Sequence, residues 1–422
     1  MKINPSRPSV FFKSLTYYNM KINPSRPSVF FKSLTSLTVL AWAGEISFGA
    51  TAAQAVKFNF VPEQGTSQQA INGFTAAGKL WSDNFTDDIT VNIDIAFKSL
   101  EPGVLGETSL ETIGSRYSTV REALNEDKQS TDDATAVANL QTGAALNFLT
   151  TNPFTGNTIR DNNSTTNNVA LDVNRANAKA LGLLSSNNTS TDASITFNSD
   201  FTFDFDRSNG INSDAYDFVG VAAHEIGHAL GFSSGVDTVD YFSEPNGPGA
   251  PLSLQNYRVF TPLDLFRFSD ASKAQGVPDL AAGSNAYFSI DKGQTNLGQF
   301  STGVYNGDGR QASHWKDALD LGIMDPTAAN GELLKISGLD LRAFDVIGWD
   351  LADGAMDRAL SENSAGSLDS QATTPNNLAA DINIGQPVGG NPASVPEPST
   401  LPGLIALGAG FFWLKRSKRS CN

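Results

Sequence analysis

Residues 214–232 read Asp-Ala-Tyr-Asp-Phe-Val-Gly-Val-Ala-Ala-His-Glu-Ile-Gly-His-Ala-Leu-Gly-Phe and hold two of the three histidines in the chain. In a helix, His224 and His228 lie one turn apart, so both imidazoles can reach one metal ion. Glu225 sits beside His224 and can contact a water at that metal without being a ligand. The His-Glu-x-x-His spacing is typical of zinc hydrolases, so the stretch predicts a metal site with Glu225 as general base.

The stretch also has the apolar spacing of a helix that buries one face. That face is formed by Val219, Ala222, Ile226 and Leu230. The histidines lie towards the other face with three glycines, Gly220, Gly227 and Gly231, which leave room beside a metal. Gly231 can take a left-handed conformation and end the helix. An amphipathic helix with two solvated histidines fits the same pattern, so the motif alone leaves both interpretations open.

The spacing of His224, His228 and Gly231 resembles that of the metzincin zinc peptidases, whose motif is His-Glu-x-x-His-x-x-Gly-x-x-His. This chain departs from the motif at its last position, where Ser234 stands in place of the histidine. Two ligands alone make a weak zinc site, so a third ligand has to come from elsewhere in the chain.

The one remaining histidine, His314, is followed by Trp315, and the segment Gly-Ile-Met-Asp-Pro occupies residues 322–326. This combination resembles the leishmanolysin-like branch of the metzincins. In that branch a long insertion precedes the third histidine, a Trp follows it, and a Met-turn ends in Pro. The resemblance implies that His314 is the third ligand and that Met324 is the Met-turn residue beneath the zinc.

The same resemblance makes residues 232–313 the insertion and residues 339–349 the helix that closes the domain. All three histidines of the chain then fall in one site, which is improbable for histidines scattered over a surface. Leishmanolysins are rich in disulfides, whereas the only cysteine here is Cys421, the penultimate residue.

Three acidic residues are rival third ligands. Asp237 and Asp240 would make a site like that of the aspzincins, although their ordinary role is in a solvated loop. Glu244 would suit a gluzincin, but it lies in Ser-Glu-Pro-Asn-Gly-Pro-Gly (243–249), whose prolines and glycines exclude a helix.

Strand and helix patterns alternate irregularly through residues 56–350, which predicts an α+β domain with a mixed sheet. The resemblance makes this domain a metzincin-like zinc peptidase. The expected strands are 56–61, 90–100, 170–173, 193–197 and 201–205. The expected helices are 68–81, 115–125, 175–184, 214–232 and 339–349.

The charge distribution bears on partners. The formal net charge of the chain is −15, and residues 56–395 alone carry −23. Because nucleic acid binding needs a basic surface, nucleic acid is not an expected partner. With no cysteine in residues 56–395, the domain has no thiolate nucleophile and no cysteine metal ligand.

Residues 1–16 recur without change at 20–35, which indicates that 1–19 is a duplicated segment, read as an artefact, and that Met20 is the start. Residues 20–55 have the pattern of a signal peptide: a basic region, an apolar stretch at 34–44, and small residues at Ala53 and Ala55. Export from the cytoplasm is therefore expected.

Residues 351–394 are rich in Ala, Ser, Asn, Asp and Gly and predict a flexible linker. Residues 395–422 then combine Val-Pro-Glu-Pro, an apolar run at 401–414 and a basic end. The run is short for a span of about 20 residues and could by length be a core helix. The basic end favours a membrane stop with that end in the cytoplasm, and hence a transient membrane contact. The segment resembles the PEP-CTERM sorting signal of Gram-negative bacteria, which implies cleavage by an exosortase and a secreted or surface location.

Hard oxygen ligands crowd the loop before the active helix, which is a weaker indication of a second cation, Ca²⁺. They are Asp204, Asp206, Asn209, Asn212 and Asp214. A polar turn that ends in a helix N-cap explains the same residues.

Together the patterns predict a secreted or surface-sorted zinc endopeptidase that cleaves a protein or peptide substrate, with Glu225 as base and His224, His228 and His314 as ligands. Two other functions remain open at this point. One is a non-catalytic surface or matrix protein that keeps a metzincin fold, and the other is a zinc hydrolase of a non-peptide amide.

Overall fold

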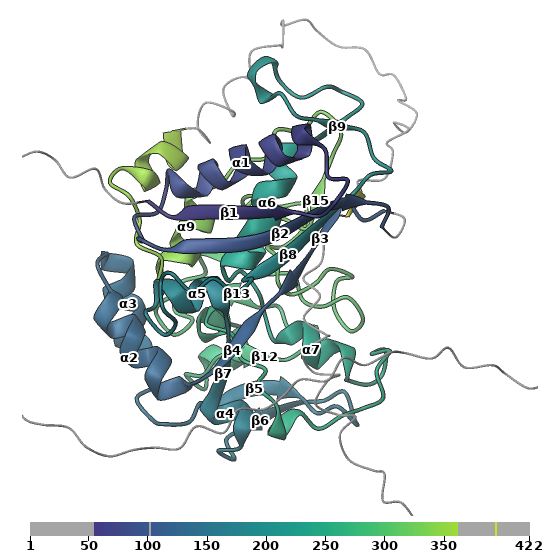
Figure 1. The fold of residues 1–422 in the computed structure, drawn as a ribbon. Coiled ribbons are helices and arrows are strands. Elements are labelled where there is room, and N and C mark those ends of the chain that lie inside the picture. The colour runs from purple at the N-terminus through teal and green to yellow at the C-terminus, as the bar shows by residue number, and fades with distance from the viewer. Residues whose placement is uncertain (1–54, 101–102, 362–392, 395–422) are drawn as a thin grey trace, which may run out of the picture. The chain divides into compact units, whose positions relative to one another are not determined.

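The computed structural model describes residues 55–100, 103–361 and 393–394 (Figure 1). The duplicated segment 1–19, the signal peptide up to residue 54, most of the expected linker and the sorting segment 395–422 lie outside the described residues. Helices and strands follow one another in mixed order through the described part, so the α+β prediction is confirmed.

The largest sheet holds four strands in the order β1-β2-β8-β3. They are β1 (Lys57–Pro62), β2 (Thr90–Lys98), β8 (Ala193–Asn198) and β3 (Gly106–Leu110). The first three run parallel, and β3 pairs with β8 in the antiparallel sense, which confirms the predicted mixed sheet. The register places Ile93 and Ile95 opposite Ala193 and Ile195, and all four side chains are buried.

Two helices pack beside this sheet: α1 (Gln68–Ser82) and α6 (Phe218–Leu230). α6 carries His224 and His228. α1 packs against β1 and against α6, and α6 also packs against β3 (Figure 1). The close approach of the two helices depends on Gly73, because a Cβ there would collide with the ring of Phe218. The sequence of α1 therefore sets where α6 lies on the sheet.

The other elements form smaller units around this layer. β4 (Thr112–Arg116) pairs with β7 (Ala170–Asn174), and β5 (Phe148–Thr151) lies between β6 (Thr158–Asp161) and β12 (Asp279–Leu280). Further helices are α2 (Tyr117–Asp127), α3 (Thr131–Asn139), α4 (Thr166–Val169), α5 (Arg175–Ala180), α7 (Val236–Tyr241), α8 (Asp270–Lys273) and α9 (Gly338–Asp345). Short strands are β9 (Phe203–Asp204), β10 (Tyr216–Asp217), β11 (Arg267–Phe268), β13 (Tyr287–Phe288), β14 (Gly298–Gln299), β15 (Thr327–Ala328) and β16 (Ala393–Ser394).

Most expected elements are present, with shifted ends. The strands expected at 56–61, 90–100, 170–173 and 193–197 correspond to β1, β2, β7 and β8. The helices expected at 68–81, 115–125 and 339–349 correspond to α1, α2 and α9. Several predictions were too long. The strand at 201–205 is reduced to β9, and the helix at 175–184 ends with α5 at Ala180. The helix expected within 214–232 is α6, which covers Phe218–Leu230, and the helix expected at 339–349 ends with α9 at Asp345.

The linker prediction needs a correction at its start, because the folded part does not end at residue 350. Leu351 forms a bridge with Phe85, and residues 355–361 are helical. Ala355 and Ala359 of that helix are buried. These apolar residues have helical spacing over less than two turns, which is too short a signal to stand out from an Ala-rich linker.

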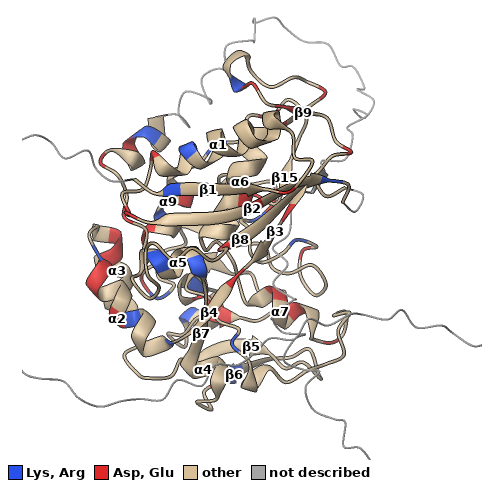
Figure 2. Ribbon diagram, in the orientation of Figure 1, with Lys and Arg blue, Asp and Glu red and all other residues tan. Residues whose placement is uncertain are grey.

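Charged side chains are unevenly spread over the described residues. Acidic residues are prominent on α3 and α7, and basic residues on α5 (Figure 2). Among the described residues, no helix has the length and apolarity that a membrane span requires.

Candidate metal centre

The helix that carries the first two histidines is α6, and it begins where the sequence supplies a cap. The Asp217 carboxylate accepts the backbone N–H of Gly220 at 3.0 Å, and the helix ends at Gly231, which has a φ of 128°. The predicted sharp end at Gly231 is confirmed. The φ of Gly231 lies in the region that favours glycine, so this position explains the Gly of the motif.

All thirteen residues of α6 are buried, including His224 and His228. The expectation of one buried face was therefore wrong, and so was the alternative of two solvated histidines. A helix that is apolar on most sides is buried on all of them. Side chains from other elements hold its backbone carbonyls: Trp81 donates to Ala223 at 2.8 Å and Trp349 to Leu230 at 3.0 Å.

The glycines of α6 have a different role from the expected one. A Cβ on Gly227 would collide with the sulfur of Met324, and a Cβ on Gly220 would collide with Asp217 and Leu334. These glycines therefore admit neighbouring side chains against the helix. Gly227 lies between His224 and His228 in the sequence, so the sulfur of Met324 reaches α6 at that position.

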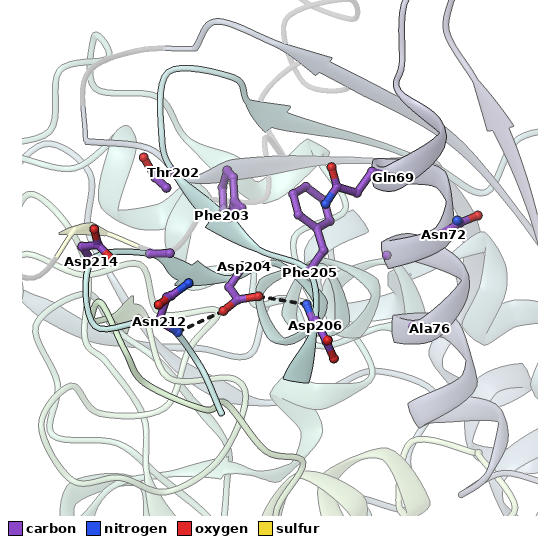
Figure 3. A pocket seen from close by; sticks show the side chains of 12 residues that line it. Gln69, Asn72, Ala76, Thr202, Phe203, Asp204, Phe205, Asp206, Asn212 and Asp214 are labelled. Carbon is purple, nitrogen blue, oxygen red and sulfur yellow. Dashed lines mark hydrogen bonds between the residues drawn. The ribbon is translucent and has the colours of Figure 1, made fainter. Parts of the chain in front are cut away.

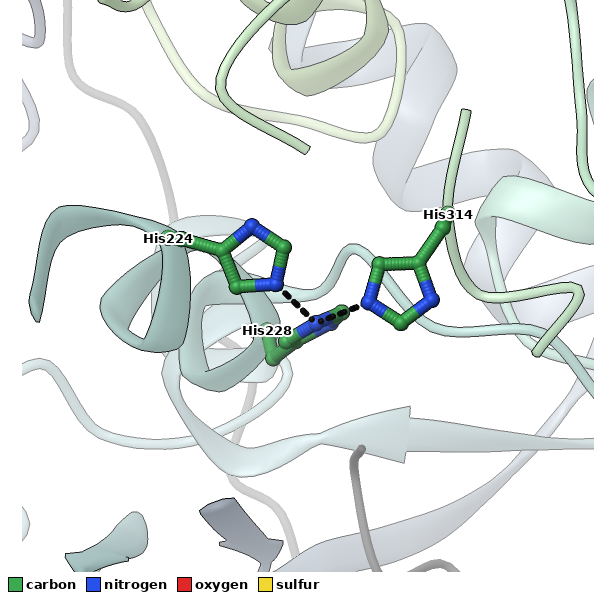
Figure 4. Close-up of side chains that lie close together, drawn as sticks. All are labelled: His224, His228 and His314. Atoms are coloured by element: carbon green, nitrogen blue, oxygen red, sulfur yellow. Dashed lines mark hydrogen bonds between the residues drawn. The ribbon is translucent and has the colours of Figure 1, made fainter. Parts of the chain in front are cut away.

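The three imidazoles converge although they come from distant segments (Figure 4). Nε2 of His228 lies 3.0 Å from Nε2 of His224 and 3.2 Å from Nε2 of His314. All three side chains are buried, and they form a group of ligand atoms that lie within 4.8 Å of one another. The residues can therefore hold one metal ion.

Each imidazole is oriented by a backbone carbonyl at its other nitrogen. Nδ1 lies 2.6 Å from Ile323 O in His224, 2.7 Å from Phe232 O in His228, and 3.3 Å from Gln311 O in His314. A carbonyl only accepts, so each Nδ1 carries the proton and each neutral Nε2 presents a lone pair.

Three lone pairs that face one another in a buried space repel unless a cation lies between them. Tetrahedral zinc with Zn–N bonds of about 2.0–2.1 Å separates neighbouring nitrogens by about 3.3 Å, close to the spacing of these atoms. The donor set and its orientation therefore fit a metal ion that prefers imidazole nitrogen. Burial also lowers the pKa of His228 well below its usual range, and His224 and His314 act in the same direction, which favours the neutral form.

His314 reaches the site because its segment is held on both sides. The Asp237 carboxylate accepts the N–H of Ala312 at 2.6 Å and the hydroxyl of Ser313. Ser234, the residue at the last position of the short motif, donates its N–H to Ser313 Oγ at 2.9 Å. Asp237 and Ser234 follow α6 directly, so they tie the start of the insertion to its end.

A second carboxylate, Asp340 of α9, joins the segments on the other side of His314. It accepts hydrogen bonds from Trp315 Nε1 at 2.8 Å, from the N–H of Ile323 at 2.8 Å and from the N–H of Met324 at 3.3 Å. Burial raises the pKa of this side chain, and its hydrogen bonds act in the opposite direction. Asp340 thus fixes the third histidine and the Met324 turn relative to each other.

Glu225 is fully buried, and its two carboxylate oxygens have different surroundings. Oε2 accepts a hydrogen bond from the Thr108 hydroxyl on β3, whereas the buried Oε1 has no hydrogen-bond partner among the described residues. Burial raises the pKa of Glu225 well above its usual range.

The rival ligands lie elsewhere. Asp237 binds the 312–313 segment, and Asp240 accepts the backbone N–H groups of Tyr305 and Asn306, each at 2.8 Å. Glu244 precedes Pro245 in a turn outside any helix, as expected. Within the described residues, the three histidines are the one group of at least three His, Cys, Asp or Glu side chains that could hold a metal.

The loop proposed for Ca²⁺ lines an open pocket beside α1 (Figure 3). Asp204 accepts the N–H of Asp206 at 2.9 Å and that of Asn212 at 3.0 Å, and Asp206 accepts from Ser208. These oxygens already have partners within the loop. The structure therefore supports the polar-turn interpretation here, and Asp217 supplies the helix N-cap.

Several residues of the site were missed by sequence reasoning. Thr108 gave no signal, because an isolated Thr in a polar stretch has no distinguishing pattern. Asp340 was visible only as the third residue after Ser337, a capping-box spacing that the structure confirms. Asp237 was noticed for the wrong role.

Comparisons with protein-family models, with curated proteins and with solved structures found no match for this chain.

Proposed function

We propose that this chain is a zinc-dependent endopeptidase of the metzincin type, with a leishmanolysin-like insertion between the second and third histidines. The observation that carries the proposal is the convergence of three buried imidazole Nε2 atoms. Two of these imidazoles lie on α6, which also carries Glu225. A site that served only to hold structure would have no use for a carboxylate at that position.

Zinc bound there would supply a Lewis acid that polarises the scissile carbonyl and lowers the pKa of water. The chain's own residues do the rest. The three histidines bind as neutral ligands, each oriented through Nδ1. Glu225 takes the proton of the attacking water on its free oxygen, Oε1, and passes it to the leaving amine. No covalent intermediate is needed.

Three further features support the metzincin type: the mixed sheet, the position of Met324 against Gly227, and the closing helix α9 with its hydrogen bonds to the Met324 turn. Each feature brings a distant segment to the histidines.

The proposal is tested with the purified chain, started at Met20, on casein and on a fluorogenic peptide library. We expect hydrolysis that a chelator abolishes and that added zinc restores, with one zinc per chain by elemental analysis. Hydrolysis that survives complete metal removal, or zinc-loaded protein that cleaves no peptide, would contradict the proposal.

We also propose that the protein is exported and sorted through its terminal segments, on the sequence patterns at 20–55 and 395–422. In a host that contains an exosortase, Pro396→Ala combined with Glu397→Ala should leave uncleaved precursor in the membrane. Normal release of this variant would show that the tail is not a sorting signal.

A further inference from the structure

The edge strand β3 contributes one side chain to the buried region around the metal centre. Thr108 lies in the middle of β3, opposite Ile195 of β8, and its side chain is fully buried. β3 packs against α6, so this side chain meets the helix that carries the histidines.

The hydroxyl of Thr108 makes two contacts, and both are with Glu225. Oγ1 donates to Glu225 Oε2, and it lies 3.2 Å from the backbone carbonyl oxygen of the same residue. The other carboxylate oxygen, Oε1, is buried and has no hydrogen-bond partner among the described residues. Thr108 therefore makes the two oxygens unequal: one is held and one is left to react.

We propose that Thr108 is a positioning residue for Glu225, which fixes the carboxylate so that Oε1 faces the reacting water. This inference rests on the proposed function. A glutamate side chain has three rotatable bonds, and a base works only when its oxygen is held within hydrogen-bond reach of the proton that it takes. The Thr108 hydroxyl can supply that restraint. The backbone of Thr108 is fixed by its pairing with β8, and its side chain is fully buried.

A purely structural role for Thr108 makes a different prediction. If the hydroxyl only satisfied a buried carboxylate, its loss would lower stability and leave the orientation of Glu225 and the chemical step unchanged. Two measurements therefore separate the two roles. One is the rotamer of Glu225 after the hydroxyl is removed, and the other is whether the loss of activity appears in kcat or in KM.

The experiment compares three variants of the full chain. Thr108→Val removes the hydroxyl and keeps the shape, Thr108→Ser keeps the hydroxyl, and Ser109→Ala removes a hydroxyl from the next residue of the same strand. Thr108→Ala is the second variant if the valine does not fold. Each variant is tested for zinc content, for melting temperature, for peptide hydrolysis and, by crystallography, for the Glu225 rotamer.

We expect Thr108→Val to bind one zinc, to turn Glu225 into another rotamer or several, and to lower kcat by about 10- to 100-fold with little change in KM. Thr108→Ser should restore most of the rate and the original rotamer, and Ser109→Ala should change neither. An unchanged Glu225 rotamer in Thr108→Val, or a valine variant with the kcat of the parent, would overturn the inference.

The failure of the two proposals can be told apart. If the parent chain binds zinc but cleaves no peptide, the proposed function fails, and the crystallographic rotamer still decides the role of Thr108. If the parent chain is active and the rotamer does not respond, only the role of Thr108 fails.

Discussion

The metal centre and the acidic loop at residues 204–214 both gather side chains that can bind cations, but they differ in what those side chains contact. The three histidines lie up to 90 positions apart in the chain, and their Nε2 lone pairs face one another. The acidic residues of the loop are close in sequence, yet Asp204 and Asp206 accept hydrogen bonds from their own loop.

The difference shows that neighbouring positions in a sequence do not make a metal site. What makes one is a set of buried lone pairs that are directed at a common point. The histidines meet this condition because backbone carbonyls take their other nitrogens. In the loop, by contrast, backbone N–H groups already donate to the carboxylates of Asp204 and Asp206.

The largest expected effect is the loss of metal in His314→Ala. Two protein ligands remain, so zinc affinity should fall by more than the roughly 10- to 100-fold typical of the loss of a supporting residue. His228→Ala should behave alike, and dialysed protein of both variants should contain no stoichiometric zinc. If His314→Ala keeps full occupancy and Asp240→Ala loses zinc, an aspartate is the third ligand and our assignment is wrong.

Replacement of the base should separate metal binding from hydrolysis. Glu225→Gln removes the proton acceptor but no ligand, so zinc stays while kcat falls by about 10²- to 10⁴-fold. The matched control is Glu107→Gln, which neutralises an exposed carboxylate on β3 near Glu225. A glutamine variant with the rate of the parent would remove Glu225 from the mechanism.

Asp237→Ala tests whether the insertion holds the third ligand. The change removes the acceptor of Ala312 N–H and of the Ser313 hydroxyl, so His314 loses part of its support. We expect zinc affinity, measured by competition with a chelator, to fall by about 10-fold. Asp240→Ala is the control, because Asp240 binds Tyr305 and Asn306 farther along the insertion, and it should weaken zinc binding less.

Buried carboxylates away from the site predict a pH effect. Burial and the neighbouring charge of Asp350 raise the pKa of Asp87 to about 8, against about 3.9 in an unfolded chain. Between these two pKa values the folded protein keeps a proton that the unfolded chain has released, so the free energy of unfolding falls progressively as the pH rises from about 4 to about 8. Asp87→Asn should therefore raise the melting temperature by several degrees at pH 9, where the full penalty is present, and change it least below about pH 4.

The matched control is Asp88→Asn, which alters an exposed carboxylate paired with Lys57. A pH dependence that is the same in Asp87→Asn and in the parent chain would show that Asp87 titrates as an ordinary surface carboxylate.

The smallest expected effect concerns calcium. Because the oxygens of Asp204 and Asp206 are occupied within their loop, millimolar Ca²⁺ should leave the melting temperature unchanged. Isothermal titration with Ca²⁺ should show no saturable heat. A saturable signal that Asp204→Asn abolishes would restore the loop as a cation site and remove the contrast with the histidines.

Much of the fold and part of the site could be predicted from the sequence, because the signals lie within short stretches of the chain. The helix motif fixes two histidines and Glu225 through spacing alone, and the apolar alternation of β2 is a strong strand signal. The pairing of His314 with them depended on a family resemblance, because no local rule brings together residues 86 positions apart.

What could not be predicted are the supports. Thr108, Asp237 and Asp340 act through contacts that exist only after β3, α7 and α9 have packed around α6. The burial of α6 on all sides likewise depends on α1 and on the Met324 turn. Such contacts are tertiary, and neither the periodicity nor the residue types of the sequence predict them.

The proposed function requires one zinc ion bound by three imidazoles, and the X-ray absorption spectrum of the zinc-loaded protein reports on that coordination. We predict three nitrogen neighbours with imidazole scattering at about 2.0–2.1 Å and one oxygen neighbour, with one imidazole lost in His314→Ala. A zinc shell made mainly of oxygen, or a spectrum that His314→Ala leaves unchanged, would contradict the account.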